Sequence, residues 1–310
     1  MKHSMKIPAF LSLIVAVASW GLAPVFIRLL RNAYDPYSQA FIRYLFATLV
    51  LVAICTIWFR REFFALLRNP LSLMGLACIN IAHQITWTLG CYRASATLAQ
   101  LIVQVGVIFV ILFSYVLFHE ERAVILSPLY LIGTTLSLVG VAVVLTGGRD
   151  TSGAIGLGTA TLLLIPALCW GAYAVWAKHL VTNCHPIPMF AALSIFITLG
   201  TGITAFLFGE PSCIARASGQ ILFLTFISGL LPIAIAHTSF HFAQKYLGAA
   251  FSSSCNILSP LLTYLLAALF LDDVPLTLPQ WAGAGILLSG TLMVVRKRAA
   301  VQSEEDIAPC

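Results

Sequence analysis

Long apolar runs alternate with short polar breaks along almost the whole chain. A membrane-spanning helix needs about 20 mostly apolar residues, because the hydrocarbon core of a bilayer is roughly 30 Å thick. Ten segments meet this requirement: 8–30, 37–59, 70–91, 95–118, 127–146, 156–178, 187–208, 219–242, 249–271 and 279–296. The pattern therefore predicts an all-α membrane protein with ten transmembrane helices.

Charges and helix breakers separate these segments, as at Arg60-Arg61-Glu62, Glu120-Glu121-Arg122 and Gly147-Gly148-Arg149-Asp150. The first apolar run is longer than the roughly 7–15 residues of a signal-peptide core, so we expect a retained first helix. The end of the chain, residues 299–310, is polar, and we expect it to be a disordered cytoplasmic tail.

Composition supports a bilayer rather than water as the solvent. Hydrophobic residues make up 60% of the chain and charged residues 9%, against about 25% charged residues in soluble domains. The formal net charge is +6, but no basic patch is interleaved with aromatic residues, so we expect no nucleic-acid partner. With the N-terminus inside, eleven Lys and Arg fall on the inner side and five on the outer. This bias predicts a cell (inner) membrane protein with both termini cytoplasmic.

The two halves of the sequence repeat. Ser19-Trp20-Gly21 aligns with Cys169-Trp170-Gly171 at an offset of 150, and Ile81-Ala82-His83 aligns with Ile235-Ala236-His237 at an offset of 154. Each half holds five predicted helices, and an odd number makes the second half start on the other side of the membrane. We therefore expect two inverted repeats, residues 1–148 and 149–298. Inverted repeats that meet near the bilayer midplane are typical of secondary transporters.

Several short motifs recur in order along the chain. They are Trp20-Gly21 and Trp170-Gly171, Arg43-Tyr44-Leu45-Phe46-Ala47, Phe118-His119-Glu120-Glu121, Ile132-Gly133 with Val139-Gly140, and Gln280-Trp281-Ala282-Gly283 with Ser289-Gly290. Through them, residues 8–296 resemble the EamA-type family of the drug/metabolite transporter superfamily. The resemblance implies ten helices in two inverted repeats and a central cavity lined by helices 1, 3, 4, 6, 8 and 9. It also implies ATP-independent export or exchange of amino acids, amphiphilic compounds or other metabolites.

Two positions depart from the family pattern. Helix 9 carries a helix-breaking proline, Pro260, whereas the aligned position in helix 4 is Gly106. Helix 7 has Leu193 opposite Arg43. Matching interruptions in both halves are a good pointer to a transporter's binding site, so we predict hinges at Gly106 and Pro260. Simple kinks that aid packing are the alternative.

Polar side chains within the predicted spans mark the candidate site, because polar groups in a bilayer usually face a cavity. Four-residue spacings put pairs of them on one helix face. The candidates are His83 and Trp87, Gln100 and Gln104, His237 and His241, and Asn256. The aligned His83 and His237 favour a substrate pocket in which a histidine could also carry a proton. Hydrogen bonds that hold helices together are the alternative for the amides.

Aromatic residues complete the predicted pocket. Trp20 and Trp170 lie deep inside their helices, away from the interfacial belts that Trp commonly occupies, and Tyr173 follows Trp170 by one turn. We expect an aromatic wall for an amphiphilic solute, with tight helix packing as the alternative. Arg43 is the one charge well inside a span, and it either contacts an anionic substrate group or anchors to headgroups or carbonyls. Arg28 and Lys178 are interpreted as interfacial anchors.

Several mechanisms lack the residues they require. The chain has no GxxxxGK[ST] motif for ATP and no Asp or Glu in a helix centre for a carboxylate proton relay. His237 and His241 have the spacing of two metal ligands, but no acidic residue accompanies them and the eight cysteines form no CxxC pair, so we expect no metal and no cofactor.

The leading hypothesis is a secondary transporter, not an enzyme, for a small metabolite such as an amino acid. The alternatives are a transporter of a nucleotide-like cofactor and a His-dependent membrane enzyme. A sensor with a solid core is a further alternative, but the short loops disfavour it.

Overall fold

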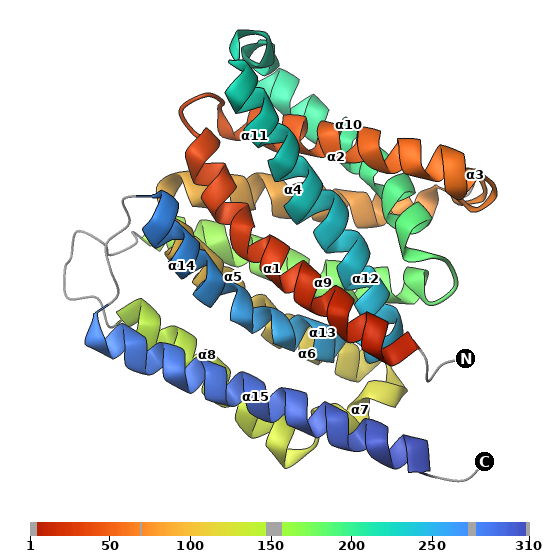
Figure 1. Ribbon diagram of the computed structural model, residues 1–310, viewed down its shortest axis with the longest axis vertical. Coiled ribbons are helices and arrows are strands. Elements are labelled where there is room, and N and C mark those ends of the chain that lie inside the picture. The colour runs from red at the N-terminus through yellow and green to blue at the C-terminus, as the bar shows by residue number, and fades with distance from the viewer. Residues whose placement is uncertain (1–4, 69, 147–156, 272–276, 308–310) are drawn as a thin grey trace.

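The structure is a computed structural model that describes residues 5–68, 70–146, 157–271 and 277–307. These residues fold into helices joined by short connections (Figure 1). In the first half the helices are α1 Lys6–Leu30, α2 Pro36–Trp58, α3 Arg60–Arg68, α4 Leu71–Arg93, α5 Ala96–Val103, α6 Gly106–Leu117, α7 His119–Ile125 and α8 Pro128–Thr146. In the second half they are α9 Leu157–Val181, α10 Pro186–Phe208, η3 Pro211–Arg216, α11 Gly219–Gly229, η4 Leu230–Ile235, α12 Ala236–Leu247, α13 Ala249–Cys255, η5 Asn256–Leu258, α14 Ser259–Phe270 and α15 Leu278–Ile307.

Every predicted span coincides with a helix or with consecutive helices. Seven spans are long and apolar enough to cross a membrane, and two bent helix pairs raise that number to nine. A shorter apolar helix covers Leu278–Val294. The chain is therefore an all-helical integral membrane protein with seven to nine candidate spans among the described residues, and the number ten stays a prediction.

The start of α1 and the end of α15 lie on the same side of the molecule, at the right of Figure 1. We call this side the terminus face and the other side the opposite face. The last helix is longer than expected, because α15 continues to Ile307 through residues 299–307, where a disordered tail was predicted. Ala, Gln and Glu in this stretch favour the helical state. Residues 308–310 and the predicted repeat boundary at 148/149 lie outside the described residues.

Helix α2, which carries Arg43, is fixed at its start by Asp35. The Asp35 carboxylate accepts hydrogen bonds from the backbone N–H groups of Tyr37 and Ser38 at 2.9 and 3.0 Å. Its other oxygen accepts from the N–H of Glu210 at 2.9 Å, just past the end of α10. Burial acts to raise the pKa of Asp35, but these hydrogen bonds lower it below its ordinary value. Asp35 thus caps α2 and ties it to α10.

The predicted span 95–118 is two helices, since α5 ends at Val103 and α6 begins at Gly106. The aligned place in the second half is η5, a short 3-10 segment that ends two residues before Pro260. Proline has no N–H to donate to the carbonyl of Asn256 four residues earlier, which accounts for the tightened turn there. At Gly106 a Cβ atom would lie 2.8 Å from the carbonyl oxygen of Ala167, so only glycine permits this close approach of α6 to α9.

A third irregularity, missed in the sequence, is the π-helical segment η4, which joins α11 to α12. It contains Pro232, which leaves the carbonyl of Ser228 without its usual donor four residues later. π-Helical turns inside α-helices occur frequently at functional sites. All three irregular segments lie beside one cavity.

Candidate functional site

A cavity of about 60 Å³ lies between the two halves of the chain. Residues from α1, α2, α4, α5, α9, η4, α12 and η5 line it: Trp20, Ala23, Arg43, His83, Gln84, Trp87, Gln100, Val103, Gln104, Trp170, Pro232, Ile233, His237 and Asn256. Nine of the eleven predicted site residues are among them. The cavity has room for a few water molecules, well below the 300–1,000 Å³ typical of ligand pockets. A metabolite would need it to widen.

The two aligned tryptophans touch each other across the boundary between the halves. The rings of Trp20 and Trp170 are 5.0 Å apart at 88°, an edge-to-face contact. Trp20 also lies 5.3 Å from His237, and Trp170 lies 5.9 Å from His83. Each half therefore contributes a tryptophan that packs against the histidine of the other half. This exchange places the repeated motifs around a shared centre.

Several polar atoms at the cavity have no hydrogen-bonding partner in the protein. They are His83 Nδ1, Gln104 Nε2, Trp170 Nε1 and Arg43 Nε. The matching atom in the first half, Trp20 Nε1, donates to the carbonyl of Pro232 at 3.1 Å. Buried polar groups in proteins are nearly always paired, so an unpaired set at one cavity marks a place for a polar ligand or water.

Arg43 lies at this cavity and not at the lipid surface. Its side chain is 2% exposed, and Nη2 donates to the carbonyl of Ser228 at 3.4 Å. This is the carbonyl that lacks a donor four residues later because that residue is Pro232. The structural interpretation of Arg43 was an anchor to lipid headgroups or to backbone carbonyls. The contact with a carbonyl is present, whereas the buried side chain does not reach the headgroups.

Two predicted residues, Tyr173 and His241, lie outside the cavity lining. The Tyr173 hydroxyl is 2.9 Å from His241 Nε2, and His241 Nδ1 is 2.9 Å from Gln244 Oε1. Gln244 Nε2 donates in turn to the carbonyl of Ala174 at 3.1 Å. The four-residue spacing of His237 and His241 predicted a shared helix face but not their different surroundings. One turn along α12 leads from the cavity into a packed, hydrogen-bonded layer.

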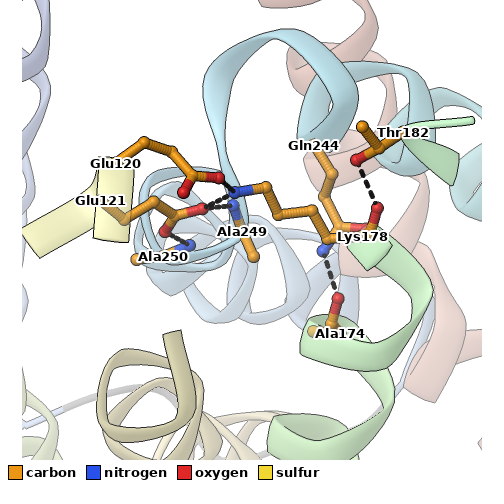
Figure 2. Close-up of polar contacts among 8 residues, drawn as sticks. All are labelled: Glu120, Glu121, Ala174, Lys178, Thr182, Gln244, Ala249 and Ala250. Carbon is orange, nitrogen blue, oxygen red and sulfur yellow. Dashed lines mark hydrogen bonds and ion pairs between the residues drawn. The ribbon is translucent and has the colours of Figure 1, made fainter. Parts of the chain in front are cut away.

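This layer ends at a buried ion pair on the terminus face. Lys178 Nζ lies 2.5 Å from Glu121 Oε1 and 3.0 Å from Glu120 Oε1. Figure 2 shows Lys178 reaching the two carboxylates, with Glu121 turned toward the backbone of Ala249 and Ala250. The N–H groups of Ala249 and Ala250 donate to Glu121 at 2.8 and 2.9 Å. Lys178 was interpreted as an interfacial anchor, which is wrong: Glu121 draws it inward.

Glu121 can reach α13 because the chain turns sharply at Gly248. Its φ of 92° lies in the left-handed region, which glycine adopts without strain. The carboxylate then meets the N-terminus of α13, where backbone N–H groups and the helix dipole favour a negative charge. Glu121 therefore joins α7 in the first half to α9 and α13 in the second. We call Lys178, Glu121 and the first turn of α13 the terminus-face clamp.

Two residues of this arrangement, Pro232 and Glu121, were not among the predicted site residues. Pro232 was visible as a proline within an apolar run, and Glu121 as an acidic residue following an apolar helix. Arg28, aligned with Lys178, donates to the carbonyl of Ala94 at 3.3 Å. His237 and His241 in α12 have the spacing of two metal ligands, for which no metal was expected, and the described part of the chain holds no group of three His, Cys, Asp or Glu placed to bind a metal.

Apolar helices packed around a small cavity with polar and aromatic walls define an integral membrane protein with a polar interior site. The EamA-like transporter family matches residues 7–146 and again 157–296. The chain therefore belongs to the EamA-like transporters of the drug/metabolite transporter superfamily. It is a membrane transporter of this type.

Individual relatives agree with this assignment. The uncharacterized inner membrane transporter YicL of Salmonella typhimurium is 21% identical over 290 residues, covering 92% of this chain and 94% of that protein. An uncharacterized transporter of Archaeoglobus fulgidus is 25% identical over 291 residues, covering 92% and 98%. A crystal structure of another protein shares the fold, with a TM-score of 0.73 at 17% identity over 97% of this chain and 99% of the other.

Proposed function

We propose that this protein carries a small metabolite, an amino acid or related amphiphilic compound, across the cell membrane by alternating access. The two five-helix repeats, 1–148 and 149–298, are inverted, and the cavity between them opens to one face at a time. Both termini lie in the cytoplasm, as the Lys and Arg distribution favours. The observation that carries the proposal is the set of unpartnered polar atoms at a cavity to which both halves contribute.

The contacts that close the cavity toward the terminus face support alternating access. Toward the terminus face, the cavity is followed by the Tyr173–His241–Gln244 layer and then by the terminus-face clamp. Substrate release on that face requires Glu121 to leave Lys178 and the first turn of α13. The helix irregularities at Gly106, η4 and Pro260 lie level with the cavity and supply bending points between its two ends.

A His-dependent enzyme finds less support. His237 Nδ1 pairs with the carbonyl of Ile233 at 3.1 Å, and His241 pairs with Tyr173 and Gln244. In the described part of the chain no carboxylate hydrogen-bonds to either ring.

Counterflow in proteoliposomes tests the proposal. Vesicles are loaded with one unlabelled solute, and uptake of the same solute in labelled form is measured. The measurement is repeated for a panel of amino acids, organic acids, amines, purines and nucleotide-like cofactors. His83→Ala and His237→Ala are expected to lower uptake while the yield of folded protein is kept. His179→Ala is the matched control, since His179 is exposed at the end of α9.

Two results would overturn the proposal. One is the absence of counterflow for every solute of the panel, whether anionic, zwitterionic, cationic or uncharged. The other is uptake that the two cavity variants leave at the wild-type rate, which would remove the cavity from the transport path.

A further inference from the structure

We infer that the solute is recognised through an anionic group, a carboxylate held at Arg43, and not through an ammonium group. This inference rests on the proposed transport function and narrows its substrate to small organic anions with an apolar body. An amino acid would then bind by its carboxylate end, and its amino group would be dispensable.

The cavity contains a positive charge without a partner of opposite charge. Among the described residues that line it, Arg43 is the one Lys, Arg, Asp or Glu, and the described part of the chain provides no carboxylate in contact with the guanidinium. A guanidinium cannot lose its charge under ordinary conditions, and an unpaired charge inside a membrane protein is costly. An anion entering the cavity supplies the missing partner.

The unpartnered polar atoms at the cavity are mostly hydrogen-bond donors. Arg43 Nε and Trp170 Nε1 are donors only, and the unpartnered Gln104 Nε2 is an amide donor. His83 Nδ1 either donates or accepts, depending on its tautomer. A ligand that satisfies these atoms must present acceptors. A carboxylate offers two oxygens with about four acceptor sites, whereas an ammonium group offers only donors.

The rest of the lining sets the body of the ligand. Trp20, Trp87 and Ile233 give the cavity apolar and aromatic walls. None of the described residues that line it is an Asp or Glu that could pair with a positive charge. The expected ligand is thus a monocarboxylate with an aliphatic or aromatic tail, and aromatic faces alone would have to hold a cation.

Arg43 also has a structural contact, which the test must separate from ligand binding. It supplies the donor that the carbonyl of Ser228 loses to Pro232, through one of its five N–H groups. Nε and its neighbours remain for a ligand. Arg43→Lys keeps the charge and can keep the Ser228 contact, but it lacks the planar fork that grips a carboxylate.

The decisive experiment uses wild-type protein in detergent and two matched ligand series. One series is 4-methylpentanoate, leucine and 3-methylbutylamine; the other is 3-phenylpropanoate, phenylalanine and 2-phenylethylamine. Members of a series share a skeleton and differ in having the carboxylate alone, both groups, or the amine alone. Tryptophan fluorescence reports binding because three tryptophans line the cavity. Each acid is expected to bind at least as tightly as its amino acid, and each amine about tenfold or more weakly.

Variants add an independent readout. Arg43→Gln is expected to weaken acid binding about tenfold or more and Arg43→Lys less, with the weak binding of the amines unchanged. Gln104→Leu removes an amide donor and leaves the charge of Arg43 in place, so it is expected to weaken acid binding by a smaller factor. It therefore still tests the inference if an Arg43 variant fails to fold.

Amines that bind as tightly as the acids would overturn the inference, as would acid binding that both Gln104→Leu and folded Arg43→Gln leave unchanged. If uncharged or cationic solutes alone show counterflow, the inference fails and transport stands. If no solute of the panel shows counterflow, transport itself fails.

Discussion

The cavity and the terminus-face clamp are polar regions in the same apolar helix bundle, but they differ in how their polar atoms are satisfied. At the clamp, Lys178 and Glu121 bind each other and Glu121 also accepts two backbone N–H groups. At the cavity, atoms of Arg43 and Trp170 have no partner. A satisfied polar group stabilises one arrangement, whereas an unsatisfied one is retained at a cost in stability. The clamp, whose polar atoms are satisfied, therefore suits closure of the terminus face, and the cavity, whose polar atoms are not, suits ligand binding.

The largest expected effect concerns the clamp. Glu121→Gln leaves Lys178 buried without its nearest carboxylate and should lower the free energy of unfolding by about 3–5 kcal/mol. Thermal stability in detergent, followed by size-exclusion chromatography, measures the change. Glu120→Gln is the matched control. The Glu120 side chain is 67% exposed against 8% for Glu121, so its loss should cost about 0–1 kcal/mol. Equal effects of the two changes would mean that the clamp is a surface ion pair only.

A pair of histidines sharpens the comparison. His241→Leu removes both ring contacts and leaves the buried Tyr173 hydroxyl unpartnered, so it should destabilise the protein by about 1–3 kcal/mol. His83→Leu removes a ring nitrogen that has no protein partner and should leave stability within about 0.5 kcal/mol of wild type. Counterflow should reverse the order, with the larger loss for His83→Leu. The same ranking in both assays would contradict the division of roles.

The aligned tryptophans provide a finer test. Trp20→Phe breaks the hydrogen bond to the carbonyl of Pro232 and should cost about 0.5–1.5 kcal/mol of stability. Trp170→Phe breaks no hydrogen bond within the protein and should mainly weaken ligand binding. Chemical unfolding and fluorescence titration of both variants check the two outcomes. A larger stability loss for Trp170→Phe would show that its ring, and not its N–H, holds the site together.

The smallest expected effect on stability is that of Gln104→Leu. The side chain is 2% exposed and its Nε2 has no partner, so an apolar replacement of similar size should leave stability unchanged or raise it slightly. A drop of more than about 1 kcal/mol would place Gln104 among residues that hold the helices together.

Much of this arrangement was predictable from hydrophobic pattern and repetition. The spacing of apolar runs located the helices, and the aligned Trp–Gly and Ile-Ala-His motifs pointed to residues that meet at one cavity. The surroundings of Tyr173 and His241 could not be predicted, because one helical turn separates a cavity wall from a packed layer. The clamp was hidden for a different reason. Lys178 and Glu121 lie 57 positions apart, and only tertiary packing brings them within an ion pair.

Access to the cavity from both faces of the membrane is the claim on which the account depends. In a variant without the eight native cysteines, Val103→Cys places a thiol at the cavity. Ile108→Cys places a control thiol on the outer surface of α6, in the middle of a candidate span, where lipid would cover it. A membrane-impermeant thiol reagent is applied from each side of oriented vesicles. Alternating access predicts that a cysteine at position 103 reacts from both sides, that the control reacts from neither, and that Glu121→Gln raises the rate from the terminus face. Reaction of position 103 from one face only, unaltered by Glu121→Gln, would contradict it.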